Sequence, residues 1–118
     1  MNKLGFAVNW REDVSGHEFV PTVDGTPLAV DGHGGLVPAS YRFGPAAEYF
    51  RGPVAAVLAC ACGEVGCRPL YCDIVVGEDT VTWTSAKGMP AFGPFTFDRG
   101  QYDGALAAIE ERFRAEQF

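Results

Sequence analysis

The chain has little basic charge and no long apolar segment. Its 118 residues include nine lysines and arginines against fifteen aspartates and glutamates, which gives a net charge of −6. Nucleic-acid binding needs Lys and Arg gathered on one face, whereas the basic residues here are scattered, so we expect no nucleic-acid partner. The longest apolar run, Pro53 to Cys62, is about half as long as a membrane-spanning helix requires. We therefore expect no membrane association.

The first ten residues also lack the features of a secretory signal. Met1 to Trp10 contains one Lys, no sustained apolar core and no small-residue cleavage site. We therefore expect a cytoplasmic protein, in which structural thiols stay reduced. Clustered cysteines in that compartment bind metal or act in catalysis more often than they form cross-links.

Glycine and proline, in contrast, are plentiful, with 15 and 8 residues, and this favours turns and short strands over long helices. The length suits a single domain, residues 1–118, with one core. The expected strands are Leu4–Trp10, Phe19–Val23, Leu28–Val30, Val54–Ala61, Pro69–Val76, Thr80–Thr84 and Phe95–Phe97. Asp24-Gly25 is typical of a tight hairpin turn, and residues 11–18 and 31–35 are expected to be loops.

Two helices are expected. The segment Pro45–Arg51 starts with proline and is followed by Gly52, the usual asymmetry of a short helix. At the C-terminus, Asp98 can cap a helix and Gln101 can complete a capping box. An apolar stripe follows at helical spacing: Tyr102, Ala105, Leu106, Ile109 and Phe113. The fold class predicted is α+β, an antiparallel meander sheet packed against a C-terminal α-helix, with one short additional helix.

Two features are predicted for the solvent-exposed surface. Glu110 and Arg114 lie four residues apart, which favours an ion pair on the solvent-exposed face of the C-terminal helix. Thr80, Thr82 and Thr84 alternate along one strand and are expected on its outer face. An exposed strand can pair with a second copy of itself, so a homodimer is one partner hypothesis.

The chemistry concentrates in one stretch that holds every cysteine within thirteen residues: Cys60, Cys62, Cys67 and Cys72. Thiolates at tetrahedral positions are typical ligands of zinc. The spacing differs from the usual pairs of Cys-x2-4-Cys, because strand residues two apart are separated by about 6.5 Å. The sulfurs can share a metal only if the backbone curls directly after Cys60, and Gly63 and Gly66 permit that curl.

The predicted metal ligands are Cys60, Cys62, Cys67 and Cys72, with Zn²⁺ as the cofactor. Cys72 is the weakest ligand, because it falls in phase with neighbouring apolar strand residues and can be a small buried hydrophobe. In that case a group outside the cluster completes the site. His33, in the glycine-rich loop, is the alternative fourth ligand, and the further candidates are His17 and Glu64.

Other states of the thiols stay open. Cys60 and Cys62 can form the reactive pair of a thiol-redox enzyme, although thioredoxin-like chemistry uses Cys-x-x-Cys at the start of a helix. Here Cys-x-Cys follows a strand and no helix comes next. Arg68, beside Cys67, can stabilise a thiolate. Unmetallated reduced thiols and a disulfide are the remaining alternatives.

The motif Cys-x-Cys-Gly-x-x-Gly-Cys-x-Pro-Leu of residues 60–70 resembles one found in small uncharacterised bacterial proteins, many of them actinobacterial. The resemblance extends to residues 22–28, 81–83, 93–98 and 101–102. It implies a single compact domain of unknown function. The chain departs from this pattern at Arg68, where similar proteins tend to carry Trp, and at Ser85 to Phe92, which lacks their histidine-containing segment.

The function predicted is that of a small soluble binding or interaction module, not an enzyme, with a cysteine-rich turn that holds structural zinc. Its partner would be another protein. One alternative is a small thiol-dependent redox enzyme using Cys60 and Cys62. A second alternative, which rests on size and charge, is an acidic immunity-type inhibitor of a basic partner. No catalytic residue and no organic cofactor is predicted.

Overall fold

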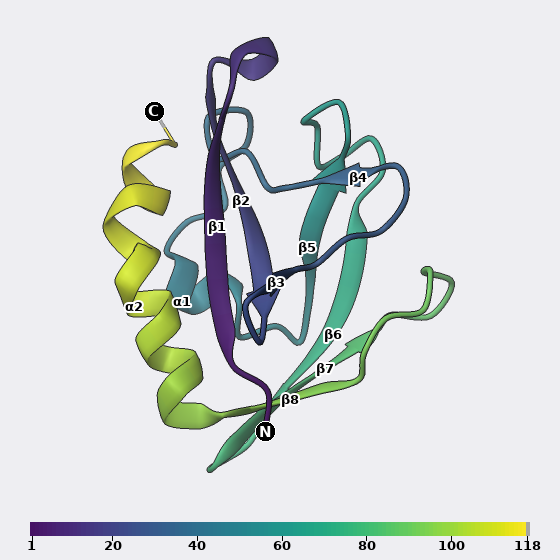
Figure 1. Cartoon of the computed structure of the whole chain (residues 1–118), viewed down its shortest axis with the longest axis vertical. Helices are drawn as coiled ribbons and strands as arrows, with labels where there is room; N and C mark the ends of the chain where they lie inside the picture. The colour runs from purple at the N-terminus through teal and green to yellow at the C-terminus, as the bar shows by residue number, and fades with distance from the viewer. Residues whose placement is uncertain (118) are drawn as a thin grey trace.

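The computed structural model describes residues 1–117 and shows two antiparallel sheets with a long helix packed alongside (Figure 1). The first sheet has the order β1 (Leu4–Arg11), β2 (Gly16–Val23) and β3 (Thr26–Pro27). The second has the order β4 (His33–Gly34), β5 (Val54–Cys60), β6 (Leu70–Val76), β7 (Thr80–Ser85) and β8 (Phe95–Asp98). The helices are the 3-10 turn η1 (Glu12–Val14), α1 (Ala46–Tyr49) and α2 (Arg99–Ala115). The predicted α+β class is confirmed.

The strands β5 to β8 form the expected meander, because each pairs antiparallel with the next. Alternation along β7 buries Val81 and Trp83 on the inner face and leaves Thr84 exposed. β5 differs, since every residue from Ala55 to Ala59 is buried. From the segment before β5, the Tyr49 hydroxyl donates to the Ala56 carbonyl at 2.6 Å.

The two sheets meet at both sides and enclose one core. Asn2 bridges to Phe97 of β8, and Phe19 of β2 bridges to Leu36, with the Phe19 amide donating to the Leu36 carbonyl at 2.7 Å. In Figure 1 the β1–β2 hairpin is seen between α2 on the left and β5 and β6 on the right. Phe19, Leu36, Trp83 and Phe97 are fully buried between these layers. The result is a strongly curved sheet system with α2 along one side.

Two glutamines near its ends fix helix α2 to the rest of the domain. Asp98 caps it as expected, accepting from the Gln101 amide at 3.0 Å. The Gln101 side chain does not complete a capping box; it accepts from the Leu4 amide at 2.8 Å and donates to the Leu4 carbonyl at 2.6 Å. Gln117 binds the amide and carbonyl of Gly44 in the same way, both at 2.9 Å. The predicted apolar stripe faces the core, with Tyr102, Leu106 and Phe113 buried.

The prediction that Glu110 pairs with Arg114 on the solvent face is wrong. The Glu110 carboxylate instead accepts from the amides of Ala46 and Ala47, at 2.9 and 3.2 Å. These are unpaired amides of the first turn of α1, where a negative charge also interacts favourably with the helix dipole. The short helix predicted at Pro45–Arg51 is present as α1, and Glu110 holds its beginning.

The β-hairpin at Asp24-Gly25 is present, with both residues at positive φ, 53° and 82°. The predicted return strand at Leu28–Val30 is wrong, because the two residues directly after the turn already form β3 and the chain then leaves the sheet. β2 begins at Gly16, earlier than predicted. His33 and Gly34, expected in a loop, form β4 against the end of β5.

β7 cannot pair edge to edge with a second copy, because β6 and β8 flank it on both sides. The expected exposure of the β7 threonines is confirmed for Thr84, while Thr80 and Thr82 are half-buried.

Within residues 1–117 no helix has the length and the apolar character needed to cross a membrane.

The buried hydrogen-bond chain through Tyr102 is predicted to contribute to stability. Trp83 Nε1 donates to the Tyr102 hydroxyl at 3.0 Å, and that hydroxyl donates to the Phe50 carbonyl. The substitution Tyr102→Phe leaves both partners unsatisfied and should lower the free energy of unfolding by about 1–3 kcal/mol in urea titrations. Tyr41→Phe is the control, since Tyr41 is 52% exposed. Equal effects of the two changes would contradict this role.

Candidate metal centre

The candidate site lies where β5 ends and the chain turns toward β6. Cys60 is the last residue of β5, and Cys62 and Cys67 lie in the turn that follows. The sulfurs of these three residues all lie within 4.8 Å of one another. Zinc–sulfur bonds of about 2.3 Å in a tetrahedron place sulfurs about 3.8 Å apart. Shifts of about 1 Å or less would therefore bring the three sulfurs onto one metal ion.

The backbone closes this turn directly after Cys60, as predicted from the glycines. The Gly63 amide donates to the Cys60 carbonyl at 2.9 Å, and the amides of Cys60 and Cys67 donate to the Glu64 carbonyl at 3.3 and 3.2 Å. Gly63 has φ +98°, and a Cβ there would come within 2.7 Å of Val14 Cγ1. Glycine is therefore needed at position 63 for two reasons: the positive φ of the backbone and the Val14 side chain beside it. Gly66 has neither constraint. Its φ is not positive, and apart from its two chain neighbours none of residues 1–117 has an atom within 4 Å of a Cβ built there.

Two contacts attach the turn to the rest of the domain. Arg11, at the end of β1, donates through a guanidinium nitrogen to the Ala61 carbonyl at 2.8 Å and is itself held by Asp13 at 3.0 and 2.5 Å. On the other side the Ala61 amide donates to the Gly32 carbonyl at 3.1 Å. The cysteine turn is therefore docked between the β1–β2 hairpin and the segment around Gly32. Nothing local in the sequence indicated the role of Arg11.

The three thiols influence one another's ionisation. The pKa of Cys60 is lowered, first by the backbone amide of Cys62 and then by hydrogen bonds from the thiols of Cys62 and Cys67. Hydrogen bonds with the thiols of Cys60 and Cys62 raise the pKa of Cys67 to about 11. The thiols of Cys62 and Cys67 therefore stabilise a thiolate at Cys60. Thiolates are the metal-binding form of cysteine.

Cys72 does not join the other three cysteines. It lies in β6, fully buried, and its sulfur lies 3.5 Å from the carbonyl oxygen of Asp73. Burial raises the pKa of this thiol to about 12. The reason is its phase along the strand, because Leu70, Cys72 and Ile74 all face the core. This burial agrees with the interpretation of Cys72 as a small buried apolar residue.

The other predicted ligands occupy different positions. His33 lies in β4, directly opposite Cys60, with its ring outside the group of three sulfurs. His17 lies at the start of β2, where its Nδ1 is 3.0 Å from a Glu116 carboxylate oxygen. Glu64 closes the turn with its backbone carbonyl and its carboxylate is not part of the group. Of these residues, the structure brings His33 alone into register with a cysteine of the cluster.

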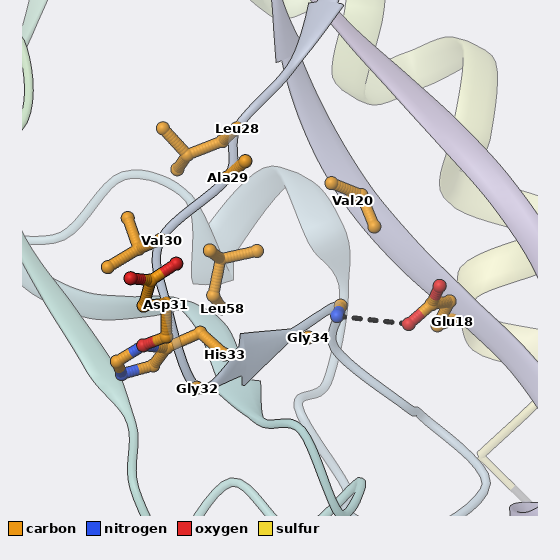
Figure 2. Close-up of a pocket in the computed structure, with 11 residues that line it drawn as sticks. Glu18, Val20, Leu28, Ala29, Val30, Asp31, Gly32, His33, Gly34 and Leu58 are labelled. Carbon is orange, nitrogen blue, oxygen red and sulfur yellow. Dashed lines mark hydrogen bonds between the residues drawn. The ribbon is translucent and has the colours of Figure 1, made fainter.

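A surface cavity of about 400 Å³ opens next to this site (Figure 2). The segment from Leu28 to Gly35 forms much of its wall, with Val20 and Leu58 as apolar neighbours. In Figure 2 Asp31 and His33 lie together at one end, and Glu18 lies at the other end, where it accepts from the Gly35 amide at 3.1 Å. His33 therefore lines the cavity and also pairs with Cys60 across the two strands.

Comparison of the chain with protein families, with curated proteins and with solved structures gives no match. The protein is a small α+β domain with a cluster of Cys60, Cys62 and Cys67 able to hold a metal ion.

The two glycines of the turn allow a matched test. Gly63→Ala should destabilise the fold by about 1–3 kcal/mol, because alanine is strained at φ +98° and its Cβ would collide with Val14. It should also weaken metal binding, because the turn can no longer gather the sulfurs. Gly66→Ala has open space and should leave both properties nearly unchanged. Thermal unfolding and zinc titration of the two variants measure the difference; similar behaviour would contradict the turn geometry.

Thiol titration should separate Cys72 from the other cysteines. All four are free thiols, with Cys62 and Cys67 exposed and Cys60 half-buried. At pH 8, in the absence of metal, the folded protein should react with three equivalents of a thiol reagent, and the fourth should appear only in denaturant. Cys72→Ala should leave the native count at three and lower the denatured count to three. Four fast equivalents from the folded chain would show that Cys72 is accessible.

Proposed function

We propose that this domain is a non-catalytic binding module whose cysteine turn is held together by a structural zinc ion. The ligands contributed by the turn are Cys60, Cys62 and Cys67. The observation that carries the proposal is the approach of these three sulfurs to within 4.8 Å on a turn that its own backbone hydrogen bonds close. Such a turn is arranged for a metal before any metal binds.

The donor set supports zinc. Thiolates are soft ligands that favour Zn²⁺, Cu(I) and iron–sulfur clusters, and zinc combines thiolates with tetrahedral geometry and no redox chemistry. Three thiolates and Zn²⁺ carry a net charge of −1, and two arginines lie nearby to balance it. Arg68 interacts favourably with ionised Cys60, and Arg11 does so with ionised Cys62.

The position of the turn supports a binding role. On one side it adjoins the cavity of about 400 Å³ formed by residues 28–35. On the other side Val65 and Gly66 line a groove of about 240 Å³ together with Tyr41, Phe43 and Tyr71. A metal that fixes the turn would fix one wall of the groove. It would also brace the segment that lines the cavity, through the Ala61–Gly32 hydrogen bond. In this proposal the metal is structural, and recognition is left to the surfaces that the turn shapes.

One observation favours the second candidate, a small thiol-redox enzyme. The lowered pKa of Cys60 and the exposure of Cys62 are properties of a reactive pair. In that function the Cys60 thiolate would attack a disulfide of the substrate and Cys62 would resolve the mixed disulfide, leaving the substrate reduced and the pair oxidised. A metal bound to the same sulfurs would block this chemistry, so metal analysis separates the two functions.

The full chain purified without chelator should contain about one zinc per molecule, and removal of zinc should lower its melting temperature. Cys60→Ser and Cys62→Ser should each lose the metal, whereas Cys72→Ala should keep it, because Cys72 lies outside the cluster. Zinc affinity should fall as the pH falls, by about tenfold per pH unit for each thiol proton displaced. A metal-free protein with one fast-reacting cysteine would instead support the redox enzyme.

A further inference from the structure

The three cysteines leave one tetrahedral position of a zinc ion unfilled, and β4 places a suitable ligand opposite them. We infer that His33 Nε2 is the fourth ligand, so that the site is Cys3His and ties residues 28–35 to the cysteine turn. This inference deepens the proposed zinc site and rests on it. Two separate observations support this role of His33: the register of β4 against β5 and the hydrogen bond of Nδ1.

The first observation is the register of β4 against β5. His33 lies directly opposite Cys60, and Gly34 opposite Ala59. The Ala61 amide donates to the Gly32 carbonyl at 3.1 Å, which makes the His33–Cys60 pair a non-hydrogen-bonded one. In such pairs the Cα atoms are about 4.5 Å apart and both side chains project from the same face. The imidazole and the Cys60 sulfur therefore start from adjacent positions on one face.

The second observation is the hydrogen bond of the other ring nitrogen. His33 Nδ1 lies 3.0 Å from the Asp31 carbonyl oxygen. A carbonyl oxygen can only accept, so in the neutral ring Nδ1 carries the proton and Nε2 keeps a free lone pair. Metal-binding histidines commonly donate their second ring N–H to a backbone carbonyl or a carboxylate, which fixes the tautomer. The tautomer of His33 is thus the one that a zinc ligand needs.

Reaching the metal requires only a local movement. The His33 ring is half-buried and lies outside the group of three sulfurs, so it has to rotate toward them. Residues 28–32 belong to no strand and can follow the ring. The competing ligands are less suited, since Cys72 is buried in the core and His17 is held by Glu116.

A consequence follows for the neighbouring cavity. His33 lies at one end of that cavity together with Asp31 (Figure 2). When His33 binds zinc, the segment that forms the cavity wall becomes attached to the cysteine turn at a second point besides the Ala61–Gly32 hydrogen bond. Metal binding should therefore order residues 28–35 as well as the turn.

The chain contains two histidines, which provides a matched pair of variants, His33→Gln and His17→Gln. Zinc X-ray absorption of the loaded full-length protein should show three sulfurs and one imidazole in the wild type and in His17→Gln. In His33→Gln the imidazole should be replaced by an oxygen ligand, and zinc affinity should fall by at least about tenfold. Amide hydrogen exchange should show that zinc protects residues 28–35 in the first two proteins and not in the third.

Different results would overturn the zinc site and the role of His33. A wild-type protein that binds no zinc overturns the proposed function and this inference together. Zinc bound by four sulfurs, or by three sulfurs and an oxygen, or by an imidazole that persists in His33→Gln, overturns the role of His33 and leaves the metal site standing. Hydrogen exchange of metal-free His33→Gln shows whether the variant is folded, and the nitrogen chemical shifts of His33 in the wild type report zinc at Nε2 without any substitution.

Discussion

The left-handed backbone at Gly63 is the constraint on which the candidate site depends. It allows the chain to turn back directly after Cys60, so that sulfurs that would diverge along a strand come within 4.8 Å of one another. The Cys60 and Glu64 carbonyls accept the hydrogen bonds that hold this shape. Because Val14 fills the space beside Gly63, the packing of η1 and the conformation of the turn require each other.

The surrounding domain gives the turn a rigid base. One end of the turn continues from β5, whose residues Ala55 to Ala59 are all buried, and the other leads into β6, which alternates between core and surface. Polar side chains then fix the elements around this core to one another: Gln101 and Gln117 hold the ends of α2, and Glu110 holds the start of α1. A site on a surface turn is well positioned when both of its ends are anchored in this way.

The sequence predicts the parts of the fold that have a regular period. The alternation of Val81 and Trp83 and the helical stripe through Tyr102 and Phe113 are local patterns, and they gave the meander and α2 correctly. The long-range polar contacts of Gln101 and Glu110 have no such signal, because their partners lie 97 and 64 residues away in the chain. β4 was missed for a related reason, since two residues within a glycine-rich loop show no period at all.

The cysteine site also combines residues that local sequence patterns place with one that they leave open. The sequence predicted a turn that gathers Cys60, Cys62 and Cys67, while the position of Cys72 depended on its phase along β6. A crystal structure with anomalous scattering recorded at the zinc edge tests this metal site without any substitution. One peak is expected about 2.3 Å from the sulfurs of Cys60, Cys62 and Cys67. Sulfurs pointing apart, or a disulfide within the turn and no peak, would contradict it.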